Sequence, residues 1–160
     1  MNFTKYLKRQ SGFTLIELLV VIGILAILLT IALIAINPAR HFQDANNTQR
    51  RADVNAVLNA IGQYMSAHNG ALPVGITTTA KTLTSTAGVS NLDLCTDLVP
   101  TYIADLPIDP TGGTESPTGS VCTDSGATYN SDYTVVSAAG NRITVNAPNA
   151  ENGATISVTR

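Results

Sequence analysis

Hydrophobic residues are concentrated in one stretch near the start of the 160-residue chain. Across residues 15–36 the only charged side chain is that of Glu17. At about 1.5 Å per residue, a helix of this length spans roughly 33 Å, which matches the apolar core of a bilayer. Lys5, Lys8 and Arg9 precede the stretch without an acidic residue among them. This pattern predicts a single-pass membrane helix whose N-terminus stays in the cytoplasm.

An amphipathic pattern follows the apolar stretch. Between residues 38 and 70, apolar side chains recur at i, i+3 and i+4 spacing, which places them on one face of a helix. This face contains Val54, Val57, Leu58, Ile61, Tyr64 and Met65. The polar residues that fall largely outside this stripe are Asp53, Asn55, Asn59 and Gln63. We therefore expect a second helix that lies with its apolar face against a globular head.

Proline and glycine mark both ends of this second helix. Asn37-Pro38 predicts a kink or a local break, because proline lacks the backbone N–H and crowds the preceding turn. Asn69-Gly70, followed by Pro73, predicts the C-terminal stop. The apolar helix is therefore assigned to residues 13–37 and the amphipathic helix to residues 38–70.

Residues 71–126 are predicted to connect the second helix to the rest of the head. A Thr-rich run at 73–88 indicates a surface loop, and leucines within 92–99 indicate a short helix or turn. Cys95 and Cys122 fall on the exported side of the membrane, where they can form one intrachain disulfide. In the chain-entropy model this bridge stabilises the head by about 3.5 kcal/mol. Two free thiols are the alternative.

The last segment, residues 127–160, has the alternation of β-strands. Two strand patterns flank residues 139–141, which indicate a hairpin turn, and a third strand is expected within 154–160. A long helix and a small antiparallel sheet give the α+β fold class.

Charge and motif content narrow the function. After Pro38 the chain carries six basic residues against ten acidic ones, whereas a nucleic-acid-binding protein usually has a basic surface. His41 and His68 lack a partner at metal-ligand spacing, and both are expected to face solvent. The chain contains no phosphate-binding loop, dinucleotide fingerprint or nucleophile elbow. We expect neither a nucleic-acid partner nor enzymatic activity.

Glu17 distinguishes the apolar stretch from ordinary N-terminal segments. A secretory signal peptide has a shorter apolar core without an acid, and it ends in a small-residue cleavage site that is not evident here. A plain membrane anchor explains the length but not the carboxylate, which costs about 2.5–3.5 kcal/mol or more in hydrocarbon. Such an acid usually has a partner or a function. We expect the partner of Glu17 to come from outside the segment.

The sequence SGFTLIELLVVIGILAIL, from Ser11 to Leu28, closely resembles the N-terminus of type IV pilins and of the pseudopilins of type II secretion. The resemblance implies that residues 1–12 are a leader, removed by a prepilin peptidase between Gly12 and Phe13. It also implies N-methylation of Phe13 and a role for Glu17 in assembly. The implied location is the cytoplasmic (inner) membrane, in contact with lipid and an assembly platform, and then an extracellular or periplasmic filament.

A physical argument supports the role that the resemblance implies for Glu17. Cleavage creates an α-ammonium at Phe13, with a reference pKa of about 7.7–8.0, and methylation preserves a basic amine. A neighbouring subunit shifted along a filament axis could bring that cation beside Glu17. At about 4 Å and an effective dielectric of about 20, the attraction is about 4 kcal/mol before desolvation.

Two positions depart from the family pattern. Many members have a proline where this chain has Ile34. The segment LPIDPTGG, which begins at Leu106, resembles one in major pseudopilins, although Thr111 stands where they commonly have tryptophan. That likeness would imply a calcium site. Its candidate ligands are Asp109, Asp124 and Asp132. The alternative is a solvated acidic loop without a cofactor, which is our expectation.

These observations favour a prepilin, a structural subunit that forms a homopolymer or co-assembles with other pilin subunits. Within the family, the major pseudopilin of a type II secretion system is the alternative. An alternative from another functional class is a monomeric membrane-anchored binding module that uses the head as a receptor. That module predicts no processing at Gly12 and no dependence on Glu17.

Overall fold

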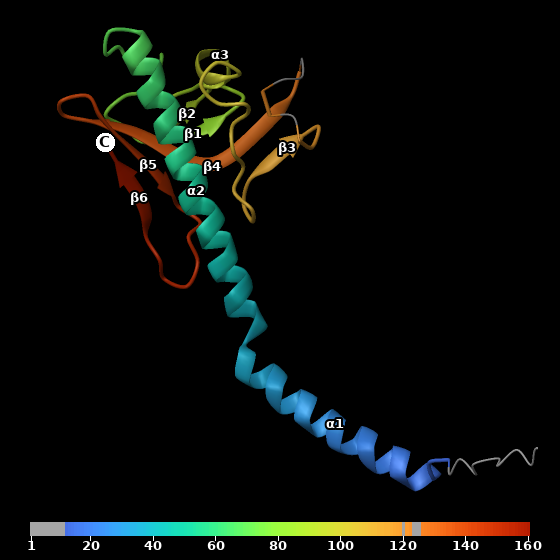
Figure 1. Ribbon diagram of the computed structural model, residues 1–160. Helices are drawn as coiled ribbons and strands as arrows, with labels where there is room; N and C mark the ends of the chain where they lie inside the picture. The colour runs from blue at the N-terminus through green and yellow to red at the C-terminus, as the bar shows by residue number, and fades with distance from the viewer. Residues whose placement is uncertain (1–11, 120, 123–125) are drawn as a thin grey trace, which may run out of the picture. The chain divides into compact units, whose positions relative to one another are not determined.

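The computed structural model describes residues 12–119, 121–122 and 126–160 (Figure 1). The predicted leader therefore lies outside the described residues, except for Gly12. The chain divides into two compact units, Met1–Ala39 and Arg40–Arg160. The elements are α1 (Leu15–Ile36), α2 (Pro38–Ala67), β1 (Lys81–Thr84), β2 (Asn91–Leu92), α3 (Cys95–Leu98), β3 (Thr114–Ser116), β4 (Thr128–Ala138), β5 (Arg142–Ala147) and β6 (Ile156–Thr159).

Helix α1 accounts for the apolar stretch. Thr14, in an extended conformation, caps its N-terminus, and Asn37 ends it in the left-handed conformation with φ of 45°. Pro38 then begins α2, so the predicted break at Asn37-Pro38 is confirmed. Proline suits a helix start because its missing N–H would have no partner there.

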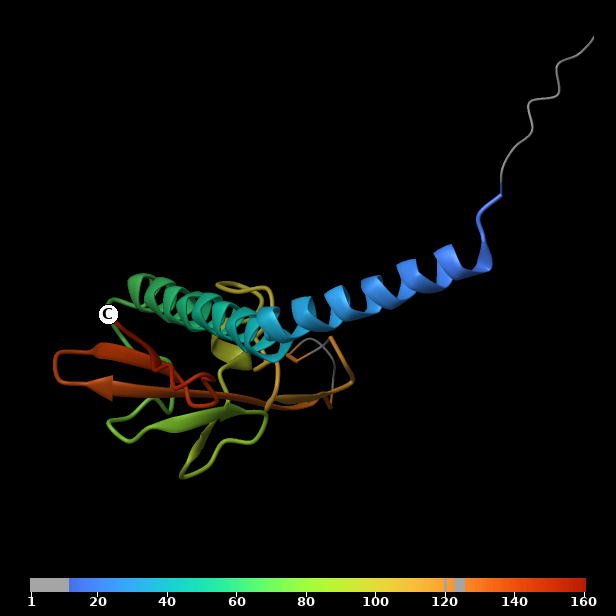
Figure 2. The same ribbon diagram turned by 90° about the horizontal axis from the view of Figure 1, so that it is seen from below.

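Helix α2 covers one face of the sheet in the head, as Figure 2 shows from below. The helix stops where the sequence predicts. Asn69 and Gly70 both have positive φ, at 54° and 83°, and the Gly70 N–H donates to the Met65 carbonyl at 2.8 Å. This bond helps to satisfy the carbonyl groups of the last helical turn, which the helix itself leaves without regular partners.

The sheet has six strands, in the order β2-β1-β4-β5-β6, with β3 also paired to β4. The hairpin β4–β5 and the final strand β6 are confirmed, and Ala138 faces Arg142 at the closed end of the hairpin. The strands of residues 127–160 pair antiparallel, as the sequence predicts. Among the described strands, β1 and β2 pair in parallel, so the sheet as a whole is mixed. The α+β class is confirmed.

The predicted surface loop at 73–88 is partly wrong, because it contains β1. Strand β1 is too short and too rich in threonine to show a clear alternation, and Leu83 is its only large apolar residue. Leu83 is nevertheless fully buried. Strand β1 is therefore held by its pairing with β2 and β4 and by the buried side chain of Leu83.

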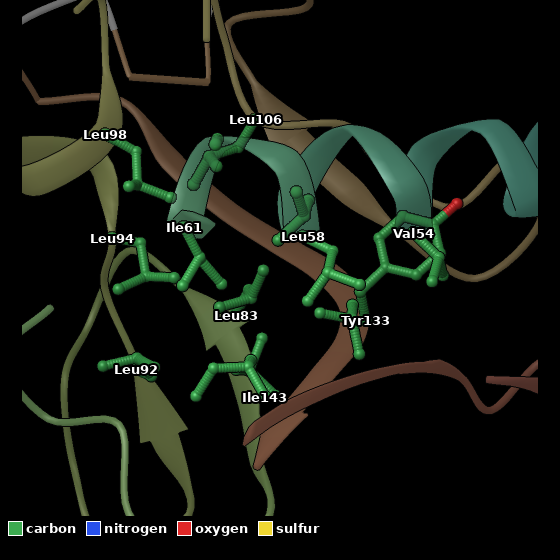
Figure 3. Close-up of a cluster of buried hydrophobic side chains, with 14 of the residues drawn as sticks. Val54, Leu58, Ile61, Leu83, Leu92, Leu94, Leu98, Leu106, Tyr133 and Ile143 are labelled. Carbon is green, nitrogen blue, oxygen red and sulfur yellow. The ribbon is translucent and has the colours of Figure 1, made fainter. Parts of the chain in front are cut away.

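The core lies between α2, the sheet and the α3 region. Figure 3 shows α2 side chains and strand side chains meeting in one cluster. Its labelled members are Val54, Leu58, Ile61, Leu83, Leu92, Leu94, Leu98, Leu106, Tyr133 and Ile143. All ten are buried, and every one of them belongs to the unit Arg40–Arg160. The head therefore has a hydrophobic core of its own.

Cys95 and Cys122 form the disulfide that the sequence predicts, with a Cα–Cα distance of 5.3 Å. Asp105 reinforces the same junction, because its carboxylate accepts the backbone N–H groups of Val121 and Cys122 at 2.9 and 3.0 Å. The disulfide and these hydrogen bonds hold the segment before β4 against α3.

Reducing the disulfide should destabilise the head. The bridge spans 27 residues, and closing a loop of that length contributes about 3.5 kcal/mol, so we expect the melting temperature to fall by about 10 °C or more. Thermal melts of the head, residues 40–160, with and without reductant test this. Membrane insertion and processing of the full chain should not change, since both involve the N-terminal segment. An unchanged melting temperature would mean that the bridge contributes no stability.

Candidate functional site

The residues that the sequence singles out lie together at the start of α1. Gly12, Phe13 and Thr14 precede the helix, have no regular secondary structure and are exposed to solvent. A Cβ placed on Gly12 would meet no atom within 4 Å. The Gly12–Phe13 peptide bond is therefore accessible from outside the chain, with no side chain on its N-terminal residue to obstruct an enzyme.

Glu17 belongs to a capping box with Thr14. The Glu17 Oε2 atom accepts the backbone N–H of Thr14 at 2.8 Å and the Thr14 hydroxyl at 2.7 Å. In return, Thr14 Oγ1 accepts the Glu17 N–H at 3.3 Å. These bonds satisfy groups at the helix N-terminus that have no partner within the helix.

The expectation that the partner of Glu17 comes only from outside the segment is therefore wrong for the single chain. The reason is the spacing Thr-x-x-Glu, which is the sequence signature of a capping box. The capping box uses Oε2, and among the described residues no hydrogen bond engages Oε1. Glu17 is also exposed. Its carboxylate thus caps its own helix and still presents one oxygen to a partner.

The rest of α1 presents apolar side chains on all sides. Its stretch Leu15–Ala35 is 21 residues long and apolar enough to cross a membrane, and none of it is buried within the chain. Phe13, just before the helix, is 83% exposed. An apolar helix near the N-terminus with no buried face fits membrane anchoring.

A second polar cluster lies inside the head, where Arg50 of α2 is fully buried. Its Nε donates to Asp109 Oδ2 at 2.7 Å and its Nη2 donates to Asp109 Oδ1 at 3.1 Å. Arg50 also donates to Glu151 Oε2 at 2.8 Å and to the Asn47 and Thr111 side chains. One guanidinium therefore joins α2 to two loops that are distant in sequence.

The ion pair shifts the protonation of its members. Burial alone would raise the pKa of Asp109, but hydrogen bonds from Arg50 and from the backbone of Gly112 and Thr111 outweigh it and lower the pKa to about 2. The bonds to Asp109 and Glu151 raise the pKa of Arg50, and the bond from Arg50 lowers that of Glu151. All three groups are therefore charged at neutral pH.

This pairing bears on the calcium hypothesis. Both Asp109 oxygens accept hydrogen bonds from Arg50, and Asp132 accepts hydrogen bonds from Asn130 and Asn149. The third candidate ligand, Asp124, lies outside the described residues. Among the residues that the structure describes, no three His, Cys, Asp or Glu side chains are grouped as a metal site. Calcium binding stays an untested hypothesis, and a guanidinium already neutralises Asp109.

Residues 7–33 match the family model of the prokaryotic N-terminal methylation motif, which is typical of type IV pilins and pseudopilins. The N-terminal segment of this chain therefore has a pilin-like methylation motif. No curated protein and no solved structure matches the chain.

The motif includes Gly12, Phe13, Thr14 and Glu17, so the resemblance drawn from the sequence is confirmed for this N-terminal segment. The motif is found in structural, pilin-type proteins and is not associated with enzymatic activity. The predicted roles of these residues in cleavage, methylation and assembly stay predictions. The matched range ends within α1, so the comparison carries no information about the head.

Sequence reasoning missed polar residues that are buried in the head. Asp53, predicted to lie outside the apolar stripe of α2, is buried and accepts the Tyr133 hydroxyl at 2.7 Å. Burial first, and then this bond, raise the pKa of Tyr133. Arg50 was also missed, although it stands four residues before Val54 on the inward face. That spacing is the signal that could have indicated its burial.

Proposed function

We propose that this chain is a prepilin. In this proposal a peptidase removes residues 1–12, the new N-terminus at Phe13 is methylated, and the mature chain assembles from the membrane into a helical filament. The observation that carries the proposal is the geometry of Glu17. It lies at the start of an exposed apolar helix, inside a methylation motif, with Oε2 capping its own helix and Oε1 open to a partner.

The ammonium of a neighbouring subunit is the partner that suits this oxygen best. Each cleaved chain has one such cation at Phe13, four residues before Glu17. In a helical array every subunit then offers one cation and one anion, so the same pair recurs at each addition. The attraction of about 4 kcal/mol before desolvation, at about 4 Å and an effective dielectric of about 20, makes the pair a docking device.

The proposed topology follows from the charge distribution. The leader is basic, which supports an N-terminus in the cytoplasm and a head on the outer side of the cytoplasmic membrane. Before assembly α1 would be covered by lipid. In the filament it would be covered by the α1 helices of neighbouring subunits, which offer an equally apolar surface.

A pilus and a type II secretion pseudopilus remain two versions of this proposal. Both require the same processing and the same docking, and they differ in the machinery that extends the filament. The genes beside this one discriminate between them: secretion-channel genes favour a pseudopilus and retraction-motor genes favour a pilus.

Processing provides the direct test. The mature chain should begin at Phe13, with the mass of residues 13–160 plus one methyl group. Intact-mass measurement on membrane fractions from cells that contain a prepilin peptidase checks this. Gly12→Val should block the cleavage, because a branched side chain obstructs access to the backbone. An unprocessed wild-type chain in such cells would contradict the prepilin proposal and favour the membrane-anchored binding module.

A further inference from the structure

The head has a groove between α2 and the part of the sheet formed by β5 and by Arg160, which follows the edge strand β6. Its volume is about 550 Å³. Leu58, Ile61, Met65 and Ile143 supply apolar lining, and the polar lining residues are Asn59, Gln63, Ser66, Asn141 and Arg160. The rim is held in place, because Arg160 and Ile143 exchange two backbone hydrogen bonds of 2.7 and 2.9 Å. This is a formed surface that no described residue fills.

Gly62 lies in this groove, in the interior of α2. A glycine at an exposed helix position costs roughly 1 kcal/mol relative to alanine. Packing within the head does not require it, because a Cβ at Gly62 would meet no atom within 4 Å. Close approach by a second molecule is a reason for glycine here, since it leaves room next to the helix backbone.

A surface of complementary character lies at the opposite edge of the sheet. In the order β2-β1-β4-β5-β6, the groove is beside β5 and β6, whereas the loop between β1 and β2 is at the other edge. Val89 in that loop is 91% exposed, and Val74 nearby is 79% exposed. Val74 and Gly88 line the same hollow, and Val89 directly follows Gly88 in the chain. The two exposed valines therefore lie close to one hollow, and we call them the Val74–Val89 projection.

The charges around the two surfaces also differ in sign. Arg160 is the charged residue that lines the groove, and its guanidinium also donates to the Asn59 side chain. The hollow beside the valines is lined by two acids, Asp93 and Asp97, against one base, Lys81. The acidic surface and the basic groove would attract one another across an interface.

We infer that the groove of one head receives the Val74–Val89 projection of a second copy of this chain. The inference rests on the proposed function and deepens it by naming head surfaces that meet in the filament. Because the two surfaces are different and lie at opposite edges of the sheet, the contact is heterologous. A heterologous contact repeated from copy to copy builds an open chain, which is the requirement for a filament.

Cross-linking of the full chain in assembled filaments tests the inference. A variant with both Gly62→Cys and Val89→Cys is treated with a short bismaleimide after shearing, which leaves the Cys95–Cys122 disulfide intact. We expect a ladder of covalent multimers on a denaturing gel, whereas each single variant gives none. A dimer from Gly62→Cys alone would show a symmetric contact and overturn the inference, as would a cross-link from either position to a different protein.

Filament yield distinguishes failure of the inference from failure of the proposed function. If the double variant forms filaments but gives no ladder, the inference fails and the proposed function stands. If the wild-type chain forms no filaments in cells with a complete assembly machinery, the proposed function fails and the inference fails with it.

A substitution in the projection provides a second test. Val89→Lys should lower filament yield about tenfold, because it removes apolar burial and places a cation against Arg160 of the groove, while processing and the head's melting temperature stay unchanged. Thr118→Lys is the matched control, since it adds the same charge at another exposed loop position. Equal yields for Val89→Lys and wild type, or an equal loss from Thr118→Lys, would overturn the inference.

Discussion

Replacing Glu17 with Gln should leave the chain inserted and processed but lower filament yield at least tenfold. Gln keeps the size of the side chain, and at this third helical position it still serves a capping box. It also lowers the cost of placing the side chain in lipid. What it removes is the attraction to the Phe13 ammonium of a neighbour, about 4 kcal/mol before desolvation at an effective dielectric of about 20, and this loss recurs at every subunit addition.

The capping box supplies a matched control. Thr14→Val removes the hydroxyl that Glu17 binds and weakens the helix cap, but it leaves the charge of Glu17 in place. Losing a cap costs about 1 kcal/mol. We therefore expect a smaller assembly defect from Thr14→Val than from Glu17→Gln.

Filaments are quantified by shearing and microscopy in cells without a wild-type copy, with membrane level and processing measured in parallel. Wild-type yield from Glu17→Gln would refute docking. Equal defects from both variants would mean that Glu17 acts mainly as a helix cap.

Replacing Arg50 with Met should destabilise the head by about 3–5 kcal/mol. Asp109 would remain buried without its counter-charge, and removing one partner of a buried pair has a cost of that size. Domains of this kind are stable by only about 5–15 kcal/mol, so the loss is a large fraction of the total. Denaturant melts of the head, residues 40–160, measure it.

The neighbouring residue provides the control. Arg51 has the same side chain on the same helix but is exposed, so Arg51→Met should change stability by less than about 1 kcal/mol. Adding Asp109→Asn to Arg50→Met should recover part of the loss, because the second change removes the unpaired charge while an amide oxygen still accepts the N–H groups of the loop. If the double variant loses as much stability as the two single variants added together, the result would argue against a buried ion pair.

Acid should act on the same pair. The pKa of Asp109 is lowered from 3.8 to about 2 in the folded head, so its contribution is present above about pH 4 and is lost as pH falls toward 2. The wild-type head should therefore lose about 2 kcal/mol from this group across that window. In Arg50→Met, protonation of Asp109 removes the unpaired buried charge. The difference in free energy of unfolding between wild type and variant should therefore become smaller as pH falls. A stability difference that does not change with pH would contradict the assignment of a buried Arg50–Asp109 ion pair.

The structure of the head shows where local patterns mislead. Asp53 and Arg50 are polar residues on an amphipathic helix. Their polarity alone predicts that they lie on the face of the helix that is exposed to solvent. Both are buried because each has a partner: Tyr133 is 80 residues away in the chain from Asp53, and Asp109 is 59 away from Arg50. Burial of a polar group is tolerated only with such a partner, and sequence spacing does not reveal partners at these separations.

The sequence by itself determined the apolar N-terminal helix of this protein and the two ends of that helix. The length of the apolar stretch, the Thr14-x-x-Glu17 spacing and the helix break at Asn37-Pro38 are local properties, and each depends on neighbours within a few residues. The methylation motif is likewise contained in residues 7–33. The hairpin β4–β5 was predictable for the same reason, since its strands are adjacent and alternate clearly.

Only the tertiary structure decided the rest of the head. The parallel pairing of β1 and β2 places Leu83 beside Leu92, in strands too short to be recognised from their pattern. The Arg50 cluster depends on Asp109 and on Glu151, which is 101 residues from Arg50. The groove and the valine projection exist because the strand order puts β2 and β6 at opposite edges. Each of these features comes from contacts between distant segments, which form only when the whole core packs.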